Sequence, residues 1–372
     1  MPTSARIDDL TEAVLAHEDV ARYTAEPEAR ARLDKYLAEL RTTQRYQLYR
    51  ALQHPLYAIY KKVPHVIEHA EYPRQAAAHG HLVYVSNHKS HLDYLIELLV
   101  IERSGIRPPL IAAGINLFGG PLGLLHRHIV GSIPIRRGSK DPVYLATLKA
   151  YVSEVLKRRD LLYYAEGGRS YTGELKAPKT GLLQAALQAD RTRLHIQPMA
   201  IAYDLVLEAK IITRDAMRQK KRPFANEIAE MIRHGVGYDS RVFVTFGPPI
   251  PLSEYDPSSR RALVDLAYRI QEEIGLLHKV LPTSLIASVM RGALTRRELA
   301  SRIDDLLGVL RERKANLAVT SGTQAVDEGL DLLLTRGILT MVRQQIRVRD
   351  RISLRYYART IQHLLPERRS SR

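Results

Sequence analysis

The sequence of 372 residues contains no cysteine. A chain without thiols excludes disulfide bridges, metal sites built on thiolates and a cysteine nucleophile. The N-terminus also lacks an apolar segment, because residues 1–23 carry charged side chains throughout. We therefore expect no signal peptide. The chain shows no internal repeat and no low-complexity tract.

Long hydrophobic runs are missing as well. The longest uncharged stretch covers residues 108–125 and is interrupted by prolines and glycines. A helix of that composition is poorly suited to span a lipid bilayer. We therefore expect a cytoplasmic protein, attached peripherally to the inner face of the cell membrane rather than inserted in it.

Acidic residues are too few to balance the basic ones. The chain has 56 Lys and Arg against 40 Asp and Glu, which gives a formal net charge of +16 and a pI near 9.9. Such a charge favours an acidic partner: an anionic membrane, a nucleic acid, or a phosphorylated or acidic carrier substrate. The overall composition, 45% hydrophobic and 26% charged, is typical of a globular protein with a large core.

Apolar periodicity divides the chain into three regions. Residues 1–62 have the spacing of amphipathic helices, residues 63–282 alternate short apolar runs with amphipathic segments, and residues 283–372 show helical patterns only. The alternation predicts an α/β domain with a mainly parallel sheet and flanking helices, between two helical regions. Its predicted strands are the apolar runs at residues 82–86, 110–113, 132–136, 161–165, 195–203 and 241–246. Its predicted helices are at residues 90–103, 142–158, 180–188 and 258–274.

The C-terminal region is rich in basic residues. Thr295 and Glu298 have the spacing of a capping box at the start of a helix. Residues 342–372 interleave arginines with Ile, Leu and Tyr, which is typical either of a solvated helix face or of an amphipathic surface for anionic lipid or a carrier protein. Residues 294–307 could instead begin a helix-turn-helix, but the basic residues are spread along the whole chain. We therefore expect no nucleic-acid partner.

The stretch of residues 82–95, LVYVSNHKSHLDYL, places titratable side chains directly after a predicted strand. Ligands of open α/β sheets gather at the carboxyl ends of the strands. An imidazole that acts as general base needs a carboxylate to fix its tautomer, and His88 with Asp93 offers such a pair. Five residues is not a same-face helix spacing, so the two can meet only if His88 lies in the loop and Asp93 follows the first bend. The plain alternative is a polar loop that caps a helix.

Two other histidines compete with His88. His91 lies closer to Asp93 in sequence, but we interpret it as a polar residue at the start of the helix. His234 and Asp239 repeat the five-residue spacing within a glycine-containing turn. With 14 histidines in the chain, one chance match is expected, so the spacing alone is weak support.

A second stretch, GSIPIRRG, ends a predicted strand with Arg136 and Arg137. Two guanidinium groups at the edge of a sheet are suited to bidentate recognition of phosphate. The alternative is that the charges protect a sheet edge from aggregation. The stretch itself supports both interpretations about equally.

A third stretch, YAEGGRSYTG, follows another predicted strand and is extended by PKTG. Glycine lets backbone amides approach an anion, and the Arg and hydroxyl side chains complete a cradle. The stretch is neither a P-loop nor a nucleophile elbow, because it lacks the Lys-Ser/Thr of the first and the second glycine of the other. Its candidate ligand-binding residues are Glu166, Gly167, Arg169, Ser170 and Lys179.

A fourth stretch, IQPMAIAYD, contains Pro198 inside an apolar run. A proline at such a position marks the start or the edge of a strand. By itself it indicates an ordinary buried strand.

Taken in this order, the four stretches resemble the motif blocks of the glycerolipid acyltransferases, and most of all the glycerol-3-phosphate and dihydroxyacetone-phosphate acyltransferase branch. NHKSHLD is similar to the H-x4-D block, GSIPIRR to the second block, AEGGRSYTG with PKTG to the third, and Pro198 to the proline of the fourth. The resemblance is strong over residues 80–205. Two departures, Pro134 and Tyr171, leave the acyl and acceptor preference open.

The resemblance implies an enzyme with the fold of that family. It implies His88 as general base oriented by Asp93, glycerol-phosphate contacts from the second and third blocks, and an acceptor-site role for Pro198. The phosphate contacts would come from Arg136, Arg137, Glu166, Gly167, Arg169, Ser170 and Lys179. The acyl donor would be acyl-CoA or acyl carrier protein, with glycerol 3-phosphate as acceptor and neither a metal nor another cofactor. A lysophosphatidate or other lysolipid acyltransferase is the alternative within this class.

Overall fold

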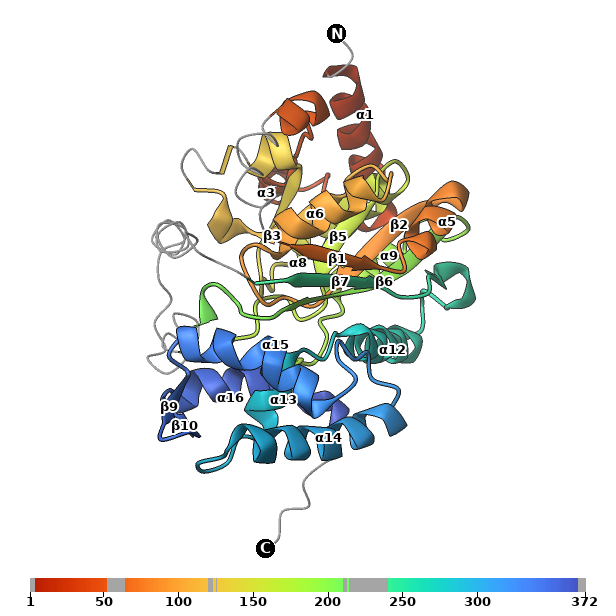
Figure 1. Ribbon diagram of the computed structural model, residues 1–372. Coiled ribbons are helices and arrows are strands. Elements are labelled where there is room, and N and C mark those ends of the chain that lie inside the picture. Colours follow the sequence, from red (N-terminus) through yellow and green to blue (C-terminus); the bar gives the residue numbers. More distant parts are fainter. Residues whose placement is uncertain are drawn as a thin grey trace, which may run out of the picture.

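The computed structural model describes residues 4–51, 64–119, 123–124, 126–209, 213 and 240–366. A twisted sheet with flanking helices forms the upper part of the molecule in Figure 1, and helices from the C-terminal region lie below it. The pair His234 and Asp239 lies outside the described residues.

The sheet is mainly parallel, which confirms the predicted fold class. Its strand order is β1-β7-β6-β2-β5-β3-β4, with β8 beside β6. Strands β2 to β6 run in one direction, whereas β7 and β8 pair antiparallel with β6. The strands are β1 (His65–Glu68), β2 (His81–Ser86), β3 (Leu110–Gly114), β4 (Ser132–Ile135), β5 (Leu161–Tyr164), β6 (Leu194–Tyr203), β7 (Val242–Phe246) and β8 (Ile250–Pro251).

The helices that precede and flank the sheet are α1 (Ser4–Leu15), α2 (Glu18–Ala21), α3 (Pro27–Leu40), α5 (Glu71–His79), α6 (Asp93–Arg103), α8 (Pro142–Leu156), α9 (Gly181–Leu187) and α12 (Arg260–Leu277). Helices α6, α8, α9 and α12 lie close to their predicted positions, α1 to α3 lie in the region predicted to be helical, and α5 was not predicted. The predicted helix of residues 90–103 begins three residues later, at Asp93.

Both faces of the sheet are covered, which explains why its central strands read as continuous apolar runs. Val83 and Val85 of β2 point into a core shared with α3, α8, α9 and α12. Leu82 and Tyr84 of the same strand point into a second core, which contains residues of α6 and of the C-terminal region. Because successive residues of a strand face opposite sides, one short run contributes to both cores.

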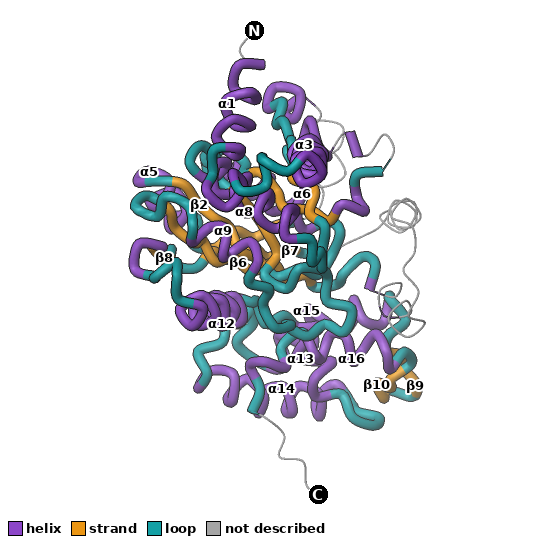
Figure 2. Tube along the Cα trace, turned by 180° about the vertical axis from the view of Figure 1, so that it is seen from behind, coloured by secondary structure: helices purple, strands orange, loops and turns teal. Residues whose placement is uncertain are grey.

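The C-terminal region contains α13 (Pro282–Val289), α14 (Arg296–Glu312), α15 (Gly322–Thr335) and α16 (Arg351–Arg359). Figure 2 shows this region below the sheet, with α12 at the level of α15. The capping box at the start of α14 is present: Thr295 N–H donates to the Glu298 carboxylate at 2.8 Å, and Glu298 N–H donates to the Thr295 hydroxyl at 3.3 Å.

The prediction of helices alone in this region is wrong. Residues Leu339–Val342 and Gln345–Val348 form an antiparallel hairpin, β9 and β10. Its two-residue turn, Arg343 and Gln344, has φ values of 48° and 63°. A turn with positive φ at both central residues matches the twist of a hairpin, although Asn and Gly are the residues usual there. The aromatic residues of the basic tail do not form an exposed amphipathic face either, because Tyr356 and Tyr357 are buried.

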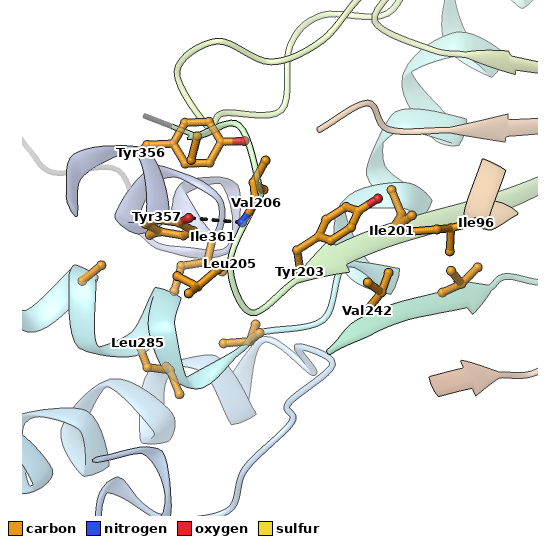
Figure 3. Packing of buried hydrophobic residues seen from close by; sticks show 14 of the residues in the cluster. Ile96, Ile201, Tyr203, Leu205, Val206, Val242, Leu285, Tyr356, Tyr357 and Ile361 are labelled. Atoms are coloured by element: carbon orange, nitrogen blue, oxygen red, sulfur yellow. Dashed lines mark hydrogen bonds between the residues drawn. The ribbon is translucent and has the colours of Figure 1, made fainter. Parts of the chain in front are cut away.

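The C-terminal region packs directly against the carboxyl ends of the strands. Figure 3 shows Tyr357 of α16 beside Leu205 and Val206, which follow β6, and the Val206 N–H donates to the Tyr357 hydroxyl at 3.1 Å. Gly173 also lies against α16, because a Cβ at this position would overlap the Tyr356 carbonyl oxygen. The loop that carries the third sequence stretch is therefore supported by α16.

Gly173→Ala is expected to destabilise the chain more than Gly138→Ala. Both glycines have positive φ, 90° and 72°, but Gly138 has open space around it. Gly138→Ala should therefore lower the free energy of unfolding only by the strain of the left-handed conformation, about 1–2 kcal/mol. Gly173→Ala should add to the same strain the displacement of α16. The measurement is the midpoint of urea unfolding. Equal midpoints for the two variants would contradict the close contact at Tyr356.

Candidate active site

The loop between β2 and α6 is folded around the Asp93 carboxylate. Its Oδ2 accepts hydrogen bonds from the backbone N–H groups of Lys89 and Ser90, at 2.6 and 2.9 Å, and lies 2.8 Å from His88 Nδ1. This arrangement explains why α6 begins at Asp93: the preceding residues turn about its side chain instead of continuing the helix. The condition for the five-residue spacing is met, with His88 in the loop and Asp93 after the bend.

The other carboxylate oxygen of Asp93 is also bonded. Tyr203, at the end of β6, donates its hydroxyl to Asp93 Oδ1 at 2.6 Å. The Asp93 side chain is fully buried and the His88 side chain is 11% exposed. With Nδ1–H donating to Asp93, the lone pair of the His88 ring is on Nε2. That tautomer is the one that a general base requires.

Burial keeps His88 neutral. It lowers the pKa of the His88 imidazole from 6.5 to about 4, with the nearby Asp93 opposing the shift and the charges of His91 and Arg169 adding to it. A neutral imidazole at physiological pH can accept a proton from an alcohol. Asp93 would stabilise the imidazolium formed in that step.

We expect His88 to titrate with a midpoint of about 4 in the folded protein, and lower still in Asp93→Asn. Between pH 6.5 and 4 the unfolded chain binds a proton at this position that the folded chain does not, so the free energy of unfolding should fall as the pH decreases through that window. NMR of ¹⁵N-labelled histidine, assigned by His88→Ala, measures the midpoint. A midpoint near 6.5 would contradict the buried environment.

The structure separates His91 from the Asp93 pair. The backbone N–H of His91 donates to Glu208 Oε1 at 2.7 Å, and the Ser90 hydroxyl donates to the same carboxylate at 2.9 Å. Arg169 Nη1 approaches Glu208 Oε1 at 3.8 Å. Glu208 thus connects the loop of the first stretch to the arginine of the third.

The two arginines of the second stretch lie on opposite sides of the strand end. Arg136 forms a bidentate pair with Glu39 of α3, at 2.7 and 2.5 Å. Arg137 instead lies over the glycines of the site, since a Cβ at Gly168 would come within 3.4 Å of its Nη1. Both residues follow Ile135, the last residue of β4, and the turn there leads their side chains to different partners. Only Arg137 is placed at the site.

The third stretch lies beside His88. The Ser170 N–H donates to the His88 carbonyl at 2.9 Å, whereas the Ser170 hydroxyl donates to the Glu174 carbonyl at 2.6 Å. Gly167 has a φ of 68° and packs against the Lys179 side chain. Its N–H donates to the Tyr164 carbonyl at 2.9 Å. The glycine is needed here because the loop turns back on itself immediately after β5.

Glu166 is buried and points one oxygen at the loop. Its Oε2 accepts from the Lys176 N–H at 3.3 Å, and its Oε1 has no hydrogen-bond partner among the described residues. Burial raises the pKa of the Glu166 carboxyl, while the charges of Lys89 and Lys176 oppose the rise. A buried acceptor without a partner is suited to bind a hydroxyl of a ligand.

Arg137, Arg169, Lys176 and Lys179 form a cluster of cationic side chains at the glycine loop. Burial lowers the pKa of the Lys176 ammonium; Glu166 opposes this, and the charges of Arg137, Arg169 and Lys179 lower the pKa further. Like charges held this close together repel one another and favour a bound anion. The arrangement can therefore hold a phosphate dianion a short distance from the His88 imidazole.

The fourth stretch supports the site through the backbone of β6. Pro198 pairs with Val85 of β2 in register, and its carbonyl accepts from the Gly247 N–H at 2.9 Å. Asn87 exchanges two hydrogen bonds with the backbone of Ile201, at 2.9 and 2.8 Å. Pro198 thus lies in the strand next to β2, and the bonds to the loop of the first stretch come from Ile201 of the same strand.

Several residues of the site were not predicted as site residues from the sequence. Tyr203 lies inside the fourth stretch, Glu208 follows it, and Lys176 lies between the two parts of the third. Lys89 is buried and its ammonium donates to the Gly173 carbonyl at 2.7 Å. The sequence signal that could have indicated such residues is their position, because charged or hydroxyl side chains that follow strands of one sheet lie at the same edge.

Two family models match the chain. Residues 65–202 match the family model described as Acyltransferase, and residues 236–368 match the one described as Glycerol-3-phosphate acyltransferase C-terminal region. The glycerol-3-phosphate acyltransferase of Alteromonas mediterranea is 34% identical over 277 residues, 68% of this chain and 33% of that protein. That of Shewanella pealeana is 29% identical over 401 residues, 96% of this chain and 49% of that protein.

The chain spans between a third and a half of the length of these curated relatives. Among solved structures, the 1-acyl-sn-glycerophosphate acyltransferase of Thermotoga maritima is similar with a TM-score of 0.38 and 15% identity, over 73% of this chain and 95% of that one. In the described part of the chain, no helix is long and apolar enough to cross a membrane, and no cluster of three or more His, Asp or Glu is placed to hold a metal ion.

Proposed function

Because this chain belongs to the glycerol-3-phosphate acyltransferase family, we propose that it transfers a fatty acyl group from an acyl thioester to the sn-1 hydroxyl of glycerol 3-phosphate. The product would be lysophosphatidate, at the first step of phospholipid synthesis. The observation that carries the proposal is the 2.8 Å contact of His88 with a buried carboxylate, beside a cluster of cations.

In the proposed reaction His88 Nε2 takes the proton of the sn-1 hydroxyl as its oxygen attacks the thioester carbonyl. The new C–O bond forms, the C–S bond breaks, and the imidazolium returns its proton to the thiolate that leaves. Asp93 stabilises the imidazolium through Nδ1. With no activated nucleophile in the site, we expect a ternary complex rather than an acyl-enzyme. The reaction calls for no cofactor besides the acyl-CoA or acyl carrier protein that donates the acyl group.

The cation cluster would bind the phosphate. Arg137, Arg169, Lys176 and Lys179 would hold the dianion, and the unpartnered oxygen of Glu166 would accept a hydroxyl of the glycerol. Fixing the acceptor in this way converts a bimolecular encounter into an aligned reaction. Arg136 would act indirectly, by attaching the end of β4 to α3 through Glu39.

We also propose that the chain works at the inner face of the cell membrane, bound peripherally. The net charge of +16 favours an anionic lipid surface. Leu124, 64% exposed, belongs to the uncharged stretch of residues 108–125, which is suited to contact lipid or the acyl chain. Cosedimentation with vesicles containing anionic phospholipid, compared with neutral vesicles, tests this part.

The test of the activity is a transfer assay with radiolabelled glycerol 3-phosphate. Acyl-CoA and acyl carrier protein are compared as donors, and 1-acylglycerol 3-phosphate is compared as an acceptor. Labelled lysophosphatidate supports the proposal; product from 1-acylglycerol 3-phosphate alone would favour the lysolipid acyltransferase. Binding to duplex DNA at moderate salt, without transfer, would favour the nucleic-acid alternative.

A further inference from the structure

The aromatic ring of Tyr164 lies flat against the imidazole of His88. The ring centroids are 3.9 Å apart and the ring planes are within 6° of parallel. Tyr164 is the last residue of β5 and is in register with Ser86, the last residue of β2. The stacking therefore comes from two adjacent strand ends, and it covers the face of the imidazole, whereas Asp93 holds its Nδ1 edge.

Tyr164 is itself held by a buried carboxyl group. Its hydroxyl donates to Glu97 Oε2 at 2.8 Å, and the Ser86 hydroxyl donates to Glu97 Oε1 at 2.5 Å. Glu97 is fully buried and stands one turn after Asp93 on α6. Residues four apart on a helix lie on the same face. The helix thus directs Asp93 to the edge of the imidazole and Glu97 to the ring stacked on its face.

Burying the Glu97 carboxyl lowers the stability of the fold unless hydrogen bonds compensate for the lost water. Burial raises the pKa of Glu97 to about 8, and the nearby Asp93 contributes to the rise. The hydrogen bonds from the Ser86 and Tyr164 hydroxyls oppose the rise, so Glu97 acts on its neighbours through these bonds.

We propose that Tyr164 and Glu97 form a positioning pair for the proposed base: Tyr164 fixes the plane of the His88 ring by stacking, and Glu97 fixes Tyr164 through its hydroxyl. The inference rests on the proposed function of His88. Neither residue touches a reacting atom. Their role is to keep Nε2 aimed at the acceptor hydroxyl, and small displacements of an aligned group are expensive in rate.

The pair predicts three graded effects. Tyr164→Leu removes the stacked ring, and we expect kcat to fall on the order of 10²-fold with the KM for glycerol 3-phosphate nearly unchanged. Tyr164→Phe removes the Tyr164–Glu97 hydrogen bond alone, whereas Glu97→Leu also removes the bond from the Ser86 hydroxyl; each should lower kcat roughly tenfold. The double variant Tyr164→Phe/Glu97→Leu should be no slower than the slower single variant, because both substitutions remove the Tyr164–Glu97 hydrogen bond. Glu97→Gln, which keeps a hydrogen-bonding side chain, should lie closer to the wild type than Glu97→Leu.

Tyr163→Phe is the matched control. Tyr163 is the neighbouring residue on β5, and it is buried in the core on the opposite face of the sheet. NMR of the full-length chain adds a readout that is independent of activity. The tyrosine ring current should shift the His88 ring-proton resonances upfield, and this shift should disappear in Tyr164→Leu and decrease in Tyr164→Phe.

The outcomes separate the two proposals. Full activity in His88→Ala would overturn the base, while the ring-current shift would still report the stacking. Two results would overturn the positioning pair if His88→Ala is inactive. One is that the losses in kcat of Tyr164→Phe and Glu97→Leu are additive, and the other is that both variants keep the wild-type kcat. If Tyr164→Leu does not fold, the double-variant comparison decides.

Discussion

Replacing His88 by alanine is expected to lower kcat on the order of 10²–10⁴-fold, the contribution typical of a positioned general base. The loss should appear in kcat rather than in the KM for glycerol 3-phosphate, because His88 is not among the cations proposed to bind phosphate. Asp93→Asn should lose a similar factor, since an amide both removes the charge facing the imidazolium and permits the wrong tautomer. Initial rates with saturating acyl donor measure both variants.

His91→Ala is the control for this experiment. It removes a histidine three residues along the same loop, whose backbone N–H bonds to Glu208 rather than to Asp93. We expect it to change kcat only a few-fold. A loss in His91→Ala as large as that in His88→Ala, or full activity in His88→Ala, would show that the base is elsewhere.

Replacing Arg137 by alanine is expected to raise the KM for glycerol 3-phosphate roughly 10- to 100-fold, which corresponds to a charge-assisted hydrogen bond of about 1.5–3 kcal/mol. The KM for the acyl donor should change little. The prediction follows from the position of Arg137 over Gly168 and from its charge coupling to the Lys176 ammonium. Competition by inorganic phosphate should weaken in the same variant.

Arg136→Ala is the matched control, because it removes the same side chain from the adjacent position. Arg136 is bonded to Glu39 on the other side of the strand end. Its removal should lower the urea midpoint and leave the KM for glycerol 3-phosphate within about a factor of two. If Arg136→Ala raised this KM as much as Arg137→Ala, the division of the two arginines between the ligand and α3 would be wrong.

The parts of the fold that the sequence predicts are those buried on both sides. Leu82 to Ser86 is a continuous apolar run because Val83 and Val85 enter one core and Leu82 and Tyr84 the other. Strand β1 was not predicted, since its four residues are all partly or fully exposed and form no apolar run. The hairpin of β9 and β10 was not predicted, because its turn residues, Arg343 and Gln344, are not the Asn and Gly that are typical of such turns.

The candidate site divides in the same way between local and distant contacts. His88 and Asp93 are five residues apart, and their relation to a strand end could be recognised from the sequence. Tyr203 bonds the same carboxylate from 110 residues away, and Glu208 reaches Ser90 across 118. Periodicity contains no information about such pairs. The same holds for Arg136 and Arg137, because both follow the end of β4 and the direction of Arg136 depends on its distant partner Glu39.

The contact of the C-terminal helices with the catalytic loop bears on how the chain unfolds. Met199, Ile201 and Tyr203 of β6 share one continuous core with Leu285 of α13 and Tyr356 of α16. The boundary predicted near residue 282 therefore separates two patterns of sequence but not two hydrophobic cores. Cutting the chain there would expose apolar surface on both fragments, so the two regions should melt in a single cooperative transition and lose the active-site geometry together.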